Sequence, residues 1–489
     1  MKNIRETIRS VISELPDEKF VWVNGQEWRF GTERPLAICD KPQVVAIIAP
    51  KSAATYLTIL SAIADMHCYV PLNVEWSMDR ISTILRTLRP DILMCDPSWF
   101  RANMNVLEYY GVAPNQPEWA AGLDGLVMLV RSDGQACSLR DYCAKVGESD
   151  VLYIMFTSGS TGIPKGVPVM RSAADHYVAE MNKTFHLAPR EKWIQAVELN
   201  FDLSAHDMLL AWSSAGSIVA IPANQAPMGP RFVRKLQVHN WLSVPSAAGR
   251  ALSLGLLKPG SMPSLRRSFF CGEALPSDTA KAWQAAASNA TLFNLYGPTE
   301  ATIAITWHEL DPGRVYGSTI PIGKPFASSS VRIDADGELQ LGGPQVFHGY
   351  LDSPAETAAK LDISDIEIRW YKTGDRARFL EDGNIAFDGR LDWQVKVRGH
   401  RVEIEEVEFA IREVTRTGLA AVVGIEQLAP GSYGGLKAFV ETGVDLAALQ
   451  KALALRLPSY MVPQKYAAID QFPQNANGKI DRLALARED

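Results

Sequence analysis

Residues 153–166 read Tyr-Ile-Met-Phe-Thr-Ser-Gly-Ser-Thr-Gly-Ile-Pro-Lys-Gly, an apolar run followed by a loop of glycine and hydroxyl residues. The apolar run from Val151 to Phe156 is short, which predicts a buried strand. Small residues let the backbone close around a bulky anion, and N–H groups, hydroxyls and the Lys165 ammonium are donors to phosphate oxygens. The loop therefore predicts a site for a nucleotide triphosphate.

Two other interpretations of this loop are weighed against that one. A cluster of Ser, Thr and Gly is often only a surface loop without a ligand. A Walker P-loop reads Gly-x-x-x-x-Gly-Lys-Ser/Thr and places its last hydroxyl on Mg²⁺. Here Lys165 follows Pro164 and precedes Gly166, so that hydroxyl is missing. The Walker motif is excluded, and the surface loop stays open at this point.

The composition is that of an ordinary soluble globular protein, with 489 residues of which 47% are hydrophobic and 21% charged. This length predicts two or more hydrophobic cores. The net charge of −6 argues against nucleic acid as the main partner. No apolar run approaches the ~18 residues of a membrane span, and the charged start argues against a signal peptide. Six scattered cysteines without metal-ligand spacing indicate a reducing, cytoplasmic compartment.

Strand-like and helix-like segments alternate before the loop. Apolar runs typical of strands begin at Gln43, Tyr69 and Ile92, and residues 51–67 and 80–88 have helical spacing. This alternation predicts a parallel, doubly wound sheet. Ligands of such sheets bind outside the carboxyl ends of the strands, which is where the loop after residue 156 falls.

A single aspartate follows the next apolar stretch, in the sequence Phe201-Asp202-Leu203-Ser204. Aspartate commonly caps the N-terminus of a helix, and residues 206–212 would form a suitable one. The other interpretation is a buried carboxylate that receives an ammonium group. The local sequence leaves both open.

Further segments carry side chains that a nucleotide site needs; they are residues 269–276, 294–301, 370–375, 387–399 and 475–482. In Asn-Leu-Tyr-Gly-Pro-Thr-Glu-Ala, Tyr296 offers a flat face to a purine or ribose, and Thr299 offers a hydroxyl to phosphate. Glu300 offers a carboxylate, which Mg²⁺ prefers together with phosphate oxygens. Each segment also has a structural alternative, such as a solvated turn, or a strand over residues 394–398 with its charges in solvent.

In this order, the loop and these segments resemble the motifs of the adenylate-forming enzymes, which include amino-acid adenylation domains, acyl-CoA synthetases and luciferases. The resemblance is specific over residues 153–482 and looser before them. It implies an α/β fold with a large N-terminal domain, residues 1–391, of doubly wound sheets plus a distorted barrel. It also implies a small, mobile α+β C-terminal domain, residues 392–489.

The same resemblance implies roles for individual residues. Lys479 would reach the reacting carboxylate and the α-phosphate, Thr299 would contact the α-phosphate, and Asp392 would be the hinge between the domains. Mg²⁺ would be held by Glu300 and Thr157. ATP would be bound by Thr157, Ser158, Gly272, Asn294, Tyr296, Gly297, Asp375, Phe387 and Arg390.

Phe-Asp-Leu-Ser is similar to the amino-acid-activating branch, in which this aspartate receives the α-ammonium of the substrate. The implied side-chain pocket consists of Leu203, His206, Ser243, Phe269, Cys271, Leu295, Ile303 and Ala304. Its large apolar members indicate a small substrate, and residues 269–276 with 294–302 look like the D-alanine–carrier-protein ligase branch. Two departures are the shorter N-terminal segment and His206, a polar group where D-alanine needs none. Glycine, L-alanine, serine, cysteine, threonine and proline stay open.

The expected reaction is the ATP-dependent activation of a small amino acid to aminoacyl-AMP with release of pyrophosphate. The aminoacyl group would then pass to the phosphopantetheine thiol of a separate carrier protein, as in nonribosomal peptide and antibiotic biosynthesis. The sequence has no Gly-Gly-x-Ser attachment site, so the acceptor is expected in trans, with coenzyme A as the other choice. An acyl-CoA synthetase for a small non-amino acid is the alternative function. A binding module without activity is disfavoured because the ionisable residues of the motifs are present.

Overall fold

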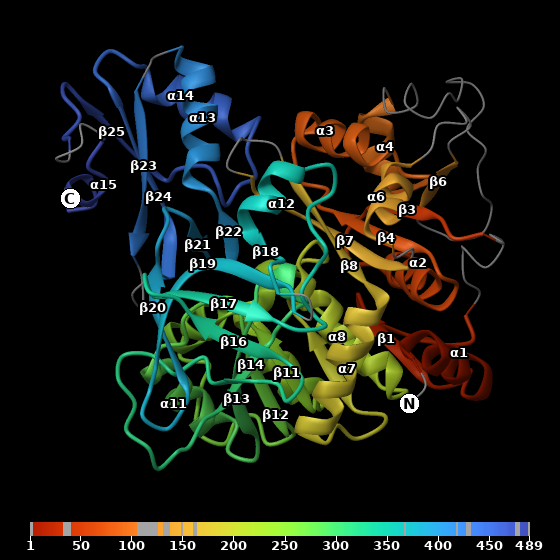
Figure 1. Ribbon diagram of the computed structural model, residues 1–489. Helices are drawn as coiled ribbons and strands as arrows, with labels where there is room; N and C mark the ends of the chain where they lie inside the picture. The colour runs from red at the N-terminus through yellow and green to blue at the C-terminus, as the bar shows by residue number, and fades with distance from the viewer. Residues whose placement is uncertain are drawn as a thin grey trace.

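The computed structural model describes residues 3–32, 41–104, 126–130, 137–147, 150–159, 164–365, 368–416, 419–426, 432–474 and 480–487. The strands of these residues form four sheets, which Figure 1 shows with the helices packed around them. The α/β class predicted from the sequence is confirmed.

The apolar run before the loop lies in a six-stranded sheet with the order β6-β5-β3-β4-β7-β8. The inner strands pair in parallel, as the alternation of strands and helices predicted, while β6 and β8 pair antiparallel at the edges. The strands are β3 (Val44–Ile48), β4 (Cys68–Leu72), β5 (Ile92–Cys95), β6 (Val127–Val130), β7 (Val151–Thr157) and β8 (Lys165–Met170).

The largest sheet has nine strands in the order β15-β14-β13-β12-β11-β9-β10-β1-β2. Its central strands are parallel, so their carboxyl ends share one edge. The strands are β1 (Lys19–Val23), β2 (Gln26–Arg29), β9 (Lys192–Gln195), β10 (Ser217–Ala220), β11 (Asn240–Ser243), β12 (Arg267–Phe270), β13 (Thr291–Tyr296), β14 (Thr306–Glu309) and β15 (Lys324–Pro325).

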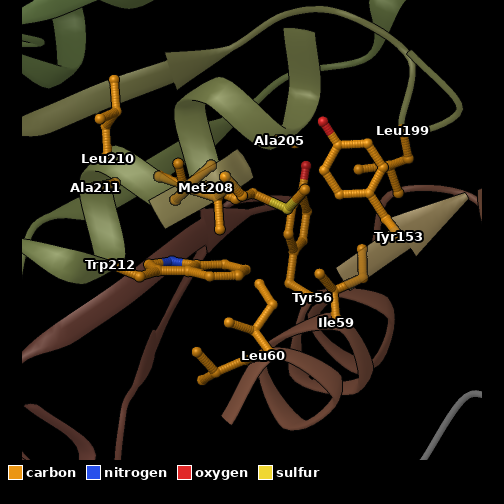
Figure 2. Close-up of a cluster of buried hydrophobic side chains, with 14 of the residues drawn as sticks. Tyr56, Ile59, Leu60, Tyr153, Leu199, Ala205, Met208, Leu210, Ala211 and Trp212 are labelled. Carbon is orange, nitrogen blue, oxygen red and sulfur yellow. The ribbon is translucent and has the colours of Figure 1, made fainter. Parts of the chain in front are cut away.

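Helices buried on nearly every side lie between these two sheets. Residues of α2 (Ala53–Ala64) and α8 (Asp202–Ser213) are almost all buried, as expected of helices that pack on several faces. Figure 2 shows Met208 and Trp212 of α8 facing Tyr56 and Leu60 of α2. The Tyr56 and Trp212 rings meet edge to face, 6.4 Å apart. This contact fixes α8, and with it the residues at its first turn.

The remaining helices cover the outer faces and edges. They are α1 (Ile4–Glu14), α3 (Met78–Leu88), α4 (Pro97–Ala102), α6 (Ser138–Val146), α7 (Arg171–Phe185), η2 (Ala223–Met228), α9 (Gly229–Leu236), α10 (Pro245–Ser253), α11 (Ser277–Ala286), η3 (Thr299–Ala301), α12 (Pro354–Lys360), α13 (Ile404–Thr415), α14 (Leu446–Ala454) and α15 (Arg482–Leu485). Among the helices of the described ranges, none is both long and apolar enough to cross a membrane.

The third sheet stands where the resemblance implied a distorted barrel. Its antiparallel strands are β16 (Ser330–Ile333), β17 (Glu338–Gly342), β18 (Leu361–Asp362), β19 (Trp370–Phe379) and β20 (Ile385–Arg390). An isolated bridge between Gly323 and Ile385 joins β20 to the chain just before β15. The third sheet is thereby tied to the edge of the nine-stranded one.

The fourth sheet contains the last strands of the chain, which Figure 1 shows in blue with α13 and α14 beside them. The strands are β21 (Val395–Val397), β22 (His400–Val402), β23 (Ala420–Glu426), β24 (Ser432–Glu441) and β25 (Lys465–Ile469). They share a separate apolar cluster with α13 and α14. The predicted domain boundary between residues 391 and 392 remains a prediction.

Two predicted helix starts are wrong. The helix expected over residues 206–212 begins earlier, at Asp202, and Phe201 is the capping residue. Residues 401–415 read in the sequence as an acidic, amphipathic helix, but the helix begins only at Ile404, because Arg401 and Val402 pair with β21 in a tight hairpin. In both cases tertiary contacts decide the first turn.

Candidate functional site

The first residue of α8 is a buried carboxylate. Asp202 is 7% exposed, and its side chain accepts hydrogen bonds from the Thr299 hydroxyl and from the backbone N–H groups of Leu203 and Ile303. Its Oδ2 is buried and has no hydrogen-bond partner among the described residues. Burial raises the pKa of Asp202 to about 6, because the charged form loses its solvation. A cation at Oδ2 would supply the missing partner.

One turn further along, His206 lies on the same face of α8. Its Nδ1 is 2.6 Å from the Tyr177 hydroxyl, and the ring centroids of Trp193 and Phe269 lie 5.6 and 5.5 Å from its own. Burial lowers the pKa of His206 to about 3, so the imidazole is neutral. The structure places His206 at an aromatic wall beyond Asp202.

Most of the residues expected around the substrate side chain lie in one buried apolar cluster; they are Leu203, Phe269, Cys271, Leu295, Ile303 and Ala304. Within it Phe269 stacks between Phe293 and Trp193, with centroid distances of 5.3 and 6.2 Å. Burial raises the pKa of Cys271 to about 12, so its thiol is neutral. Bulky rings packed beyond Asp202 favour a substrate with a small side chain.

Ser243 lies outside this cluster. Its hydroxyl accepts a hydrogen bond from Trp241 Nε1 (2.9 Å) and donates to the Val244 carbonyl (3.1 Å). Trp241 belongs to the apolar cluster on the opposite face of β11. Val244, which the sequence analysis did not single out, lies near the site instead. A Cβ atom built on Gly272 would be 3.3 Å from Cγ1 of Val244 and 3.7 Å from Cδ1 of Leu203.

The turn after η3 has a strained backbone. Thr302 and Ile303 have φ angles of 54° and 70°, a region that β-branched residues rarely adopt. Gln345 holds this turn, since its Nε2 donates to the carbonyls of Thr302 (3.2 Å) and Ala304 (2.7 Å) and its backbone carbonyl accepts from the Thr302 hydroxyl (2.8 Å). A Cβ on Gly297 would lie 2.6 Å from Ala304 Cα, so glycine is needed for this approach. Such strain is typical of ligand sites.

Four residues expected at the nucleotide or the hinge form one chain of hydrogen bonds. The Tyr296 hydroxyl donates to Asp375 Oδ2 (2.5 Å), and Arg390 Nη1 donates to Asp375 Oδ1 (2.7 Å). Arg390 also donates through Nε and Nη2 to both oxygens of Asp392, at 2.8 and 2.6 Å. Burial works against the charge of Arg390, yet the two carboxylates hold its pKa well above the ordinary value. Asp392, the predicted hinge residue, is thus tied directly to residues that were predicted to bind ATP.

Phe387 and Asn294, two other residues that were predicted to bind ATP, have different surroundings. Phe387 is partly buried beside the apolar cluster that contains Tyr296. Asn294 is 1% exposed, and its Nδ2 donates to the carbonyls of Ile320 (3.2 Å) and Pro321 (2.9 Å). Asn294 therefore anchors the chain before β15, whatever else it contacts.

The predicted phosphate loop is described only at its two ends, since residues 160–163 lie outside the described ranges. Thr157 pairs with Lys165 across β7 and β8. The Ser158 hydroxyl donates to the backbone carbonyl of Arg401 (2.9 Å), and the Lys165 ammonium lies 5.6 Å from the centroid of the Tyr350 ring. Both ends of the loop face other functional segments.

Glu300 is fully buried and already paired with a cation. Arg401 Nη1 lies 2.8 and 3.0 Å from its two carboxylate oxygens, and the Tyr350 hydroxyl donates to Oε1 at 2.7 Å. Although burial works to raise it, these contacts hold the pKa of Glu300 below its ordinary value. Sequence reasoning missed Arg401 and Tyr350, which lie 101 and 50 residues away.

The β21–β22 hairpin packs against Val244 and Phe201, next to Asp202. Its turn residues Arg398 and Gly399 both have positive φ, as in the tight turns that join antiparallel strands. A Cβ on Gly399 would lie 2.5 Å from Val244 Cγ1. His400 meets Phe201 edge to face at 4.9 Å. The strand expected over residues 394–398 is present as β21, in which Val395 and Val397 are buried while Lys396 is half-buried and Arg398 exposed.

Lys479 lies outside the described residues. Its neighbours pack on the outer part of the fourth sheet: Ile480 bridges Gln474, and Arg482 donates to Glu408 of α13 at 2.9 and 2.7 Å. Figure 1 shows α15 well apart from α8. In this arrangement the end of the chain is turned away from Asp202.

The donors around Glu300 fit a magnesium–triphosphate better than a protein-only metal centre. No group of three or more His, Cys, Asp and Glu that could hold a metal occurs in the described ranges. Mg²⁺ is usually held by one or two carboxylates together with substrate phosphates. The Arg401 guanidinium forms an ion pair with Glu300, which shows that this buried carboxylate attracts a cation.

Comparison with known proteins places the chain among nucleotide-dependent enzymes. The family model described as AMP-binding enzyme matches residues 37–351, more than half of the chain. A D-alanine–D-alanyl carrier protein ligase from Staphylococcus haemolyticus is 31% identical over 430 residues, which cover 86% of this chain and 84% of the relative.

Solved structures agree with that match. The Vibrio cholerae adenylation domain AlmE, in complex with glycyl-adenosine-5′-phosphate, has a TM-score of 0.85 and 29% identity, covering 99% of this chain and 97% of its own. The amide bond synthetase McbA from Marinactinospora thermotolerans has a TM-score of 0.80 at 20% identity, covering 98% and 99%. This second likeness concerns the fold alone.

Proposed function

The chain belongs to the family of AMP-binding enzymes, and on that basis we propose that it joins a small amino acid to a carrier-protein thiol. ATP first activates the amino acid as aminoacyl-AMP with release of pyrophosphate. The aminoacyl group then passes to the phosphopantetheine thiol of a separate carrier protein, in the cytoplasm. The observation that carries this proposal is the buried Asp202 carboxylate, whose Oδ2 has no hydrogen-bond partner among the described residues and whose neighbour Leu203 belongs to the buried apolar cluster.

Asp202 would select amino acids over other acids. An α-ammonium at Oδ2 removes the cost of an unpaired buried charge, which an acid without an amine would leave in place. The aromatic wall of Phe269 and Trp193 limits the side chain to a small one. The carrier-protein ligase and the glycyl-adenylate complex among the similar proteins support glycine or alanine as the substrate.

In the first step an oxygen of the amino-acid carboxylate attacks the α-phosphorus of ATP, and the bond to the β-phosphate oxygen breaks. Asp375 and Arg390 would hold the ribose, and Thr299 would contact the α-phosphate. Mg²⁺ bound by Glu300 and Thr157 would supply positive charge to the phosphate oxygens. In the second step the thiol sulfur attacks the acyl carbon, and AMP leaves.

The arrangement of the fourth sheet supports an assignment to the second step. The β21–β22 hairpin packs against Val244 beside the site, while Arg482 is bound to Glu408 of α13. Adenylation would then need residues 392–489 to turn about Asp392 and bring Lys479 to the α-phosphate.

Gly399→Ala is expected to slow thiol transfer by about tenfold while amino-acid-dependent pyrophosphate exchange is retained. A side chain there needs a strained positive φ, which costs ~1–2 kcal/mol, and meets Val244 at 2.5 Å. Single-turnover transfer from isolated aminoacyl-AMP measures this step. Gly443→Ala is the matched control, since Gly443 has a φ of +100° but nothing within 4 Å of its Cβ position. Equal transfer rates in the two variants would contradict the role given to the hairpin.

The pH dependence of amino-acid use is expected to follow Asp202. Its pKa is raised to about 6, so below pH 6 the carboxyl group is protonated and no longer attracts an ammonium ion. The kcat/KM for the amino acid, which reports the free enzyme, should then fall about tenfold per pH unit. ATP binding at the same pH values is the control. A profile that stays flat from pH 7 to pH 5 would speak against an ionised Asp202 as the ammonium partner.

Hydroxamate formation separates this function from that of a coenzyme A ligase for non-amino acids. We expect product with glycine or alanine and none with acetate, propionate or aryl acids. Product with the plain acids alone would favour the coenzyme A ligase.

A further inference from the structure

The chain folds back on itself just before α15. Gln474 and Ile480 form an antiparallel bridge, and the backbone N–H of Asp481 donates to the carbonyl of Pro473 (2.7 Å). Residues 475–479 lie between these contacts and outside the described ranges. The segments on either side of them are therefore held next to each other.

The second of these segments is fixed to α13 by a buried ion pair. Arg482 donates through Nε and Nη2 to Glu408 Oε1, at 3.1 and 2.9 Å, and through Nη2 to Oε2 at 2.7 Å. The Glu408 side chain is only 4% exposed, and its Oε1 also accepts from the backbone N–H of Val422 in β23 (3.0 Å). A fork of guanidinium donors on one carboxylate fixes direction as well as distance. Glu408 thus holds Arg482 in one orientation.

Arg482 has another contact close to the predicted hinge. Its guanidinium carbon lies 5.4 Å from the centroid of the Trp393 ring, and Trp393 follows Asp392 directly in the sequence. The Arg482 side chain therefore contacts both α13 and the first residue after the predicted hinge. Since all these contacts lie within residues 392–489, a turn of that part about Asp392 would leave them intact.

We propose that Glu408 and Arg482 are positioning residues for the adenylation step, which act by fixing the loop that carries Lys479. This inference rests on the proposed function, in which Lys479 reaches the α-phosphate. A lysine side chain is flexible, so a fixed backbone reduces the conformational freedom that is lost when its ammonium binds the phosphate. A displacement of about 1 Å can cost about 10²-fold in rate. The ion pair thus acts on the rate through Lys479.

Glu408→Gln tests this role, because the amide keeps the size of the side chain but lacks the charge that binds Arg482. In amino-acid-dependent pyrophosphate exchange kcat should fall about tenfold, which is less than the loss of a whole donor causes. KM for the amino acid should be unchanged, and single-turnover thiol transfer from isolated aminoacyl-AMP should keep the wild-type rate. In the Lys479→Ala background Glu408→Gln should cause no further loss, because effects that pass through one group are not additive.

Arg482→Lys is a second variant, since it keeps the positive charge but loses the fork of donors; it should lower exchange in the same way. Arg412→Ala is the matched control on the same carboxylate. Its Nη1 lies 3.9 Å from Glu408 Oε2 and its side chain is 37% exposed. Such exposed pairs on a helix contribute little, so exchange should stay within about twofold of the wild type.

Wild-type exchange in both Glu408→Gln and Arg482→Lys would overturn the inference, and so would a further loss from Glu408→Gln in the Lys479→Ala background. Loss of exchange and of thiol transfer together would show that the ion pair supports only the fold, which also overturns the positioning role. A wild type without amino-acid-dependent exchange would instead contradict the proposed function itself.

Discussion

Asp202→Asn is expected to lower kcat/KM for amino-acid-dependent pyrophosphate exchange by about 10²- to 10⁴-fold. The substrate ammonium would be buried beside a neutral amide, and loss of one partner from a buried ion pair costs about 3–5 kcal/mol, with 1.4 kcal/mol for each factor of ten. Exchange is measured with labelled pyrophosphate at saturating ATP. The buried apolar side chains near Asp202 are unchanged in this variant, so the loss would lie mainly in KM for the amino acid.

The thermal midpoint separates this role from a structural one. Burial raises the pKa of Asp202, so at neutral pH the ionised carboxylate is less favourable in the folded chain than in the unfolded chain. Asp202→Asn should therefore melt no lower than the wild type. A variant that melts well below the wild type, with unchanged kcat/KM in the remaining folded protein, would show that Asp202 serves the fold alone.

Lys479→Ala is expected to lower pyrophosphate exchange on the order of 10²- to 10³-fold, the usual loss when one donor to a developing negative charge is removed. Capture of a preformed aminoacyl-adenylate by a thiol should survive, because in the arrangement assigned to that step the β21–β22 hairpin packs against Val244 beside the site. The two half-reactions are measured separately, by isotope exchange and by single-turnover transfer.

Lys451→Ala is a suitable control for this variant, as Lys451 lies in the last turn of α14. Exchange close to wild type in Lys479→Ala would remove the assignment of Lys479, which rests on the Asn-Gly-Lys-Ile-Asp-Arg motif. Loss of both half-reactions together would show that the residue supports the fold of residues 392–489.

The sequence predicted elements with strong local patterns. Buried runs such as Val44–Ile48 and Ile92–Cys95 are strands, and the alternation with helices foretold the parallel sheet. The start of α8 at Asp202 was missed because the packing of α8 against α2, rather than a capping side chain, fixes the helix.

The sequence named the residues of the candidate site but not the contacts between them. The motifs named Tyr296, Asp375, Arg390 and Asp392, yet nothing local indicated that one hydrogen-bonded chain joins them. The supporting residues Gln345, Tyr350 and Arg401 act across 40 residues or more, and no spacing pattern links them to the residues they hold. The face of β11 on which the Ser243 side chain lies depends on the register of that strand, which the sequence did not determine.

Pyrophosphate exchange across all amino acids in both chiralities tests the central claim most directly. The account predicts ATP-dependent exchange with glycine or with one enantiomer of alanine, and little with large or acidic side chains, because Phe269 and Trp193 fill the space beyond Asp202. Serine, cysteine, threonine and proline belong to the same panel as small substrates. Exchange with no amino acid, together with exchange driven by a carboxylic acid that lacks an amine, would contradict the account.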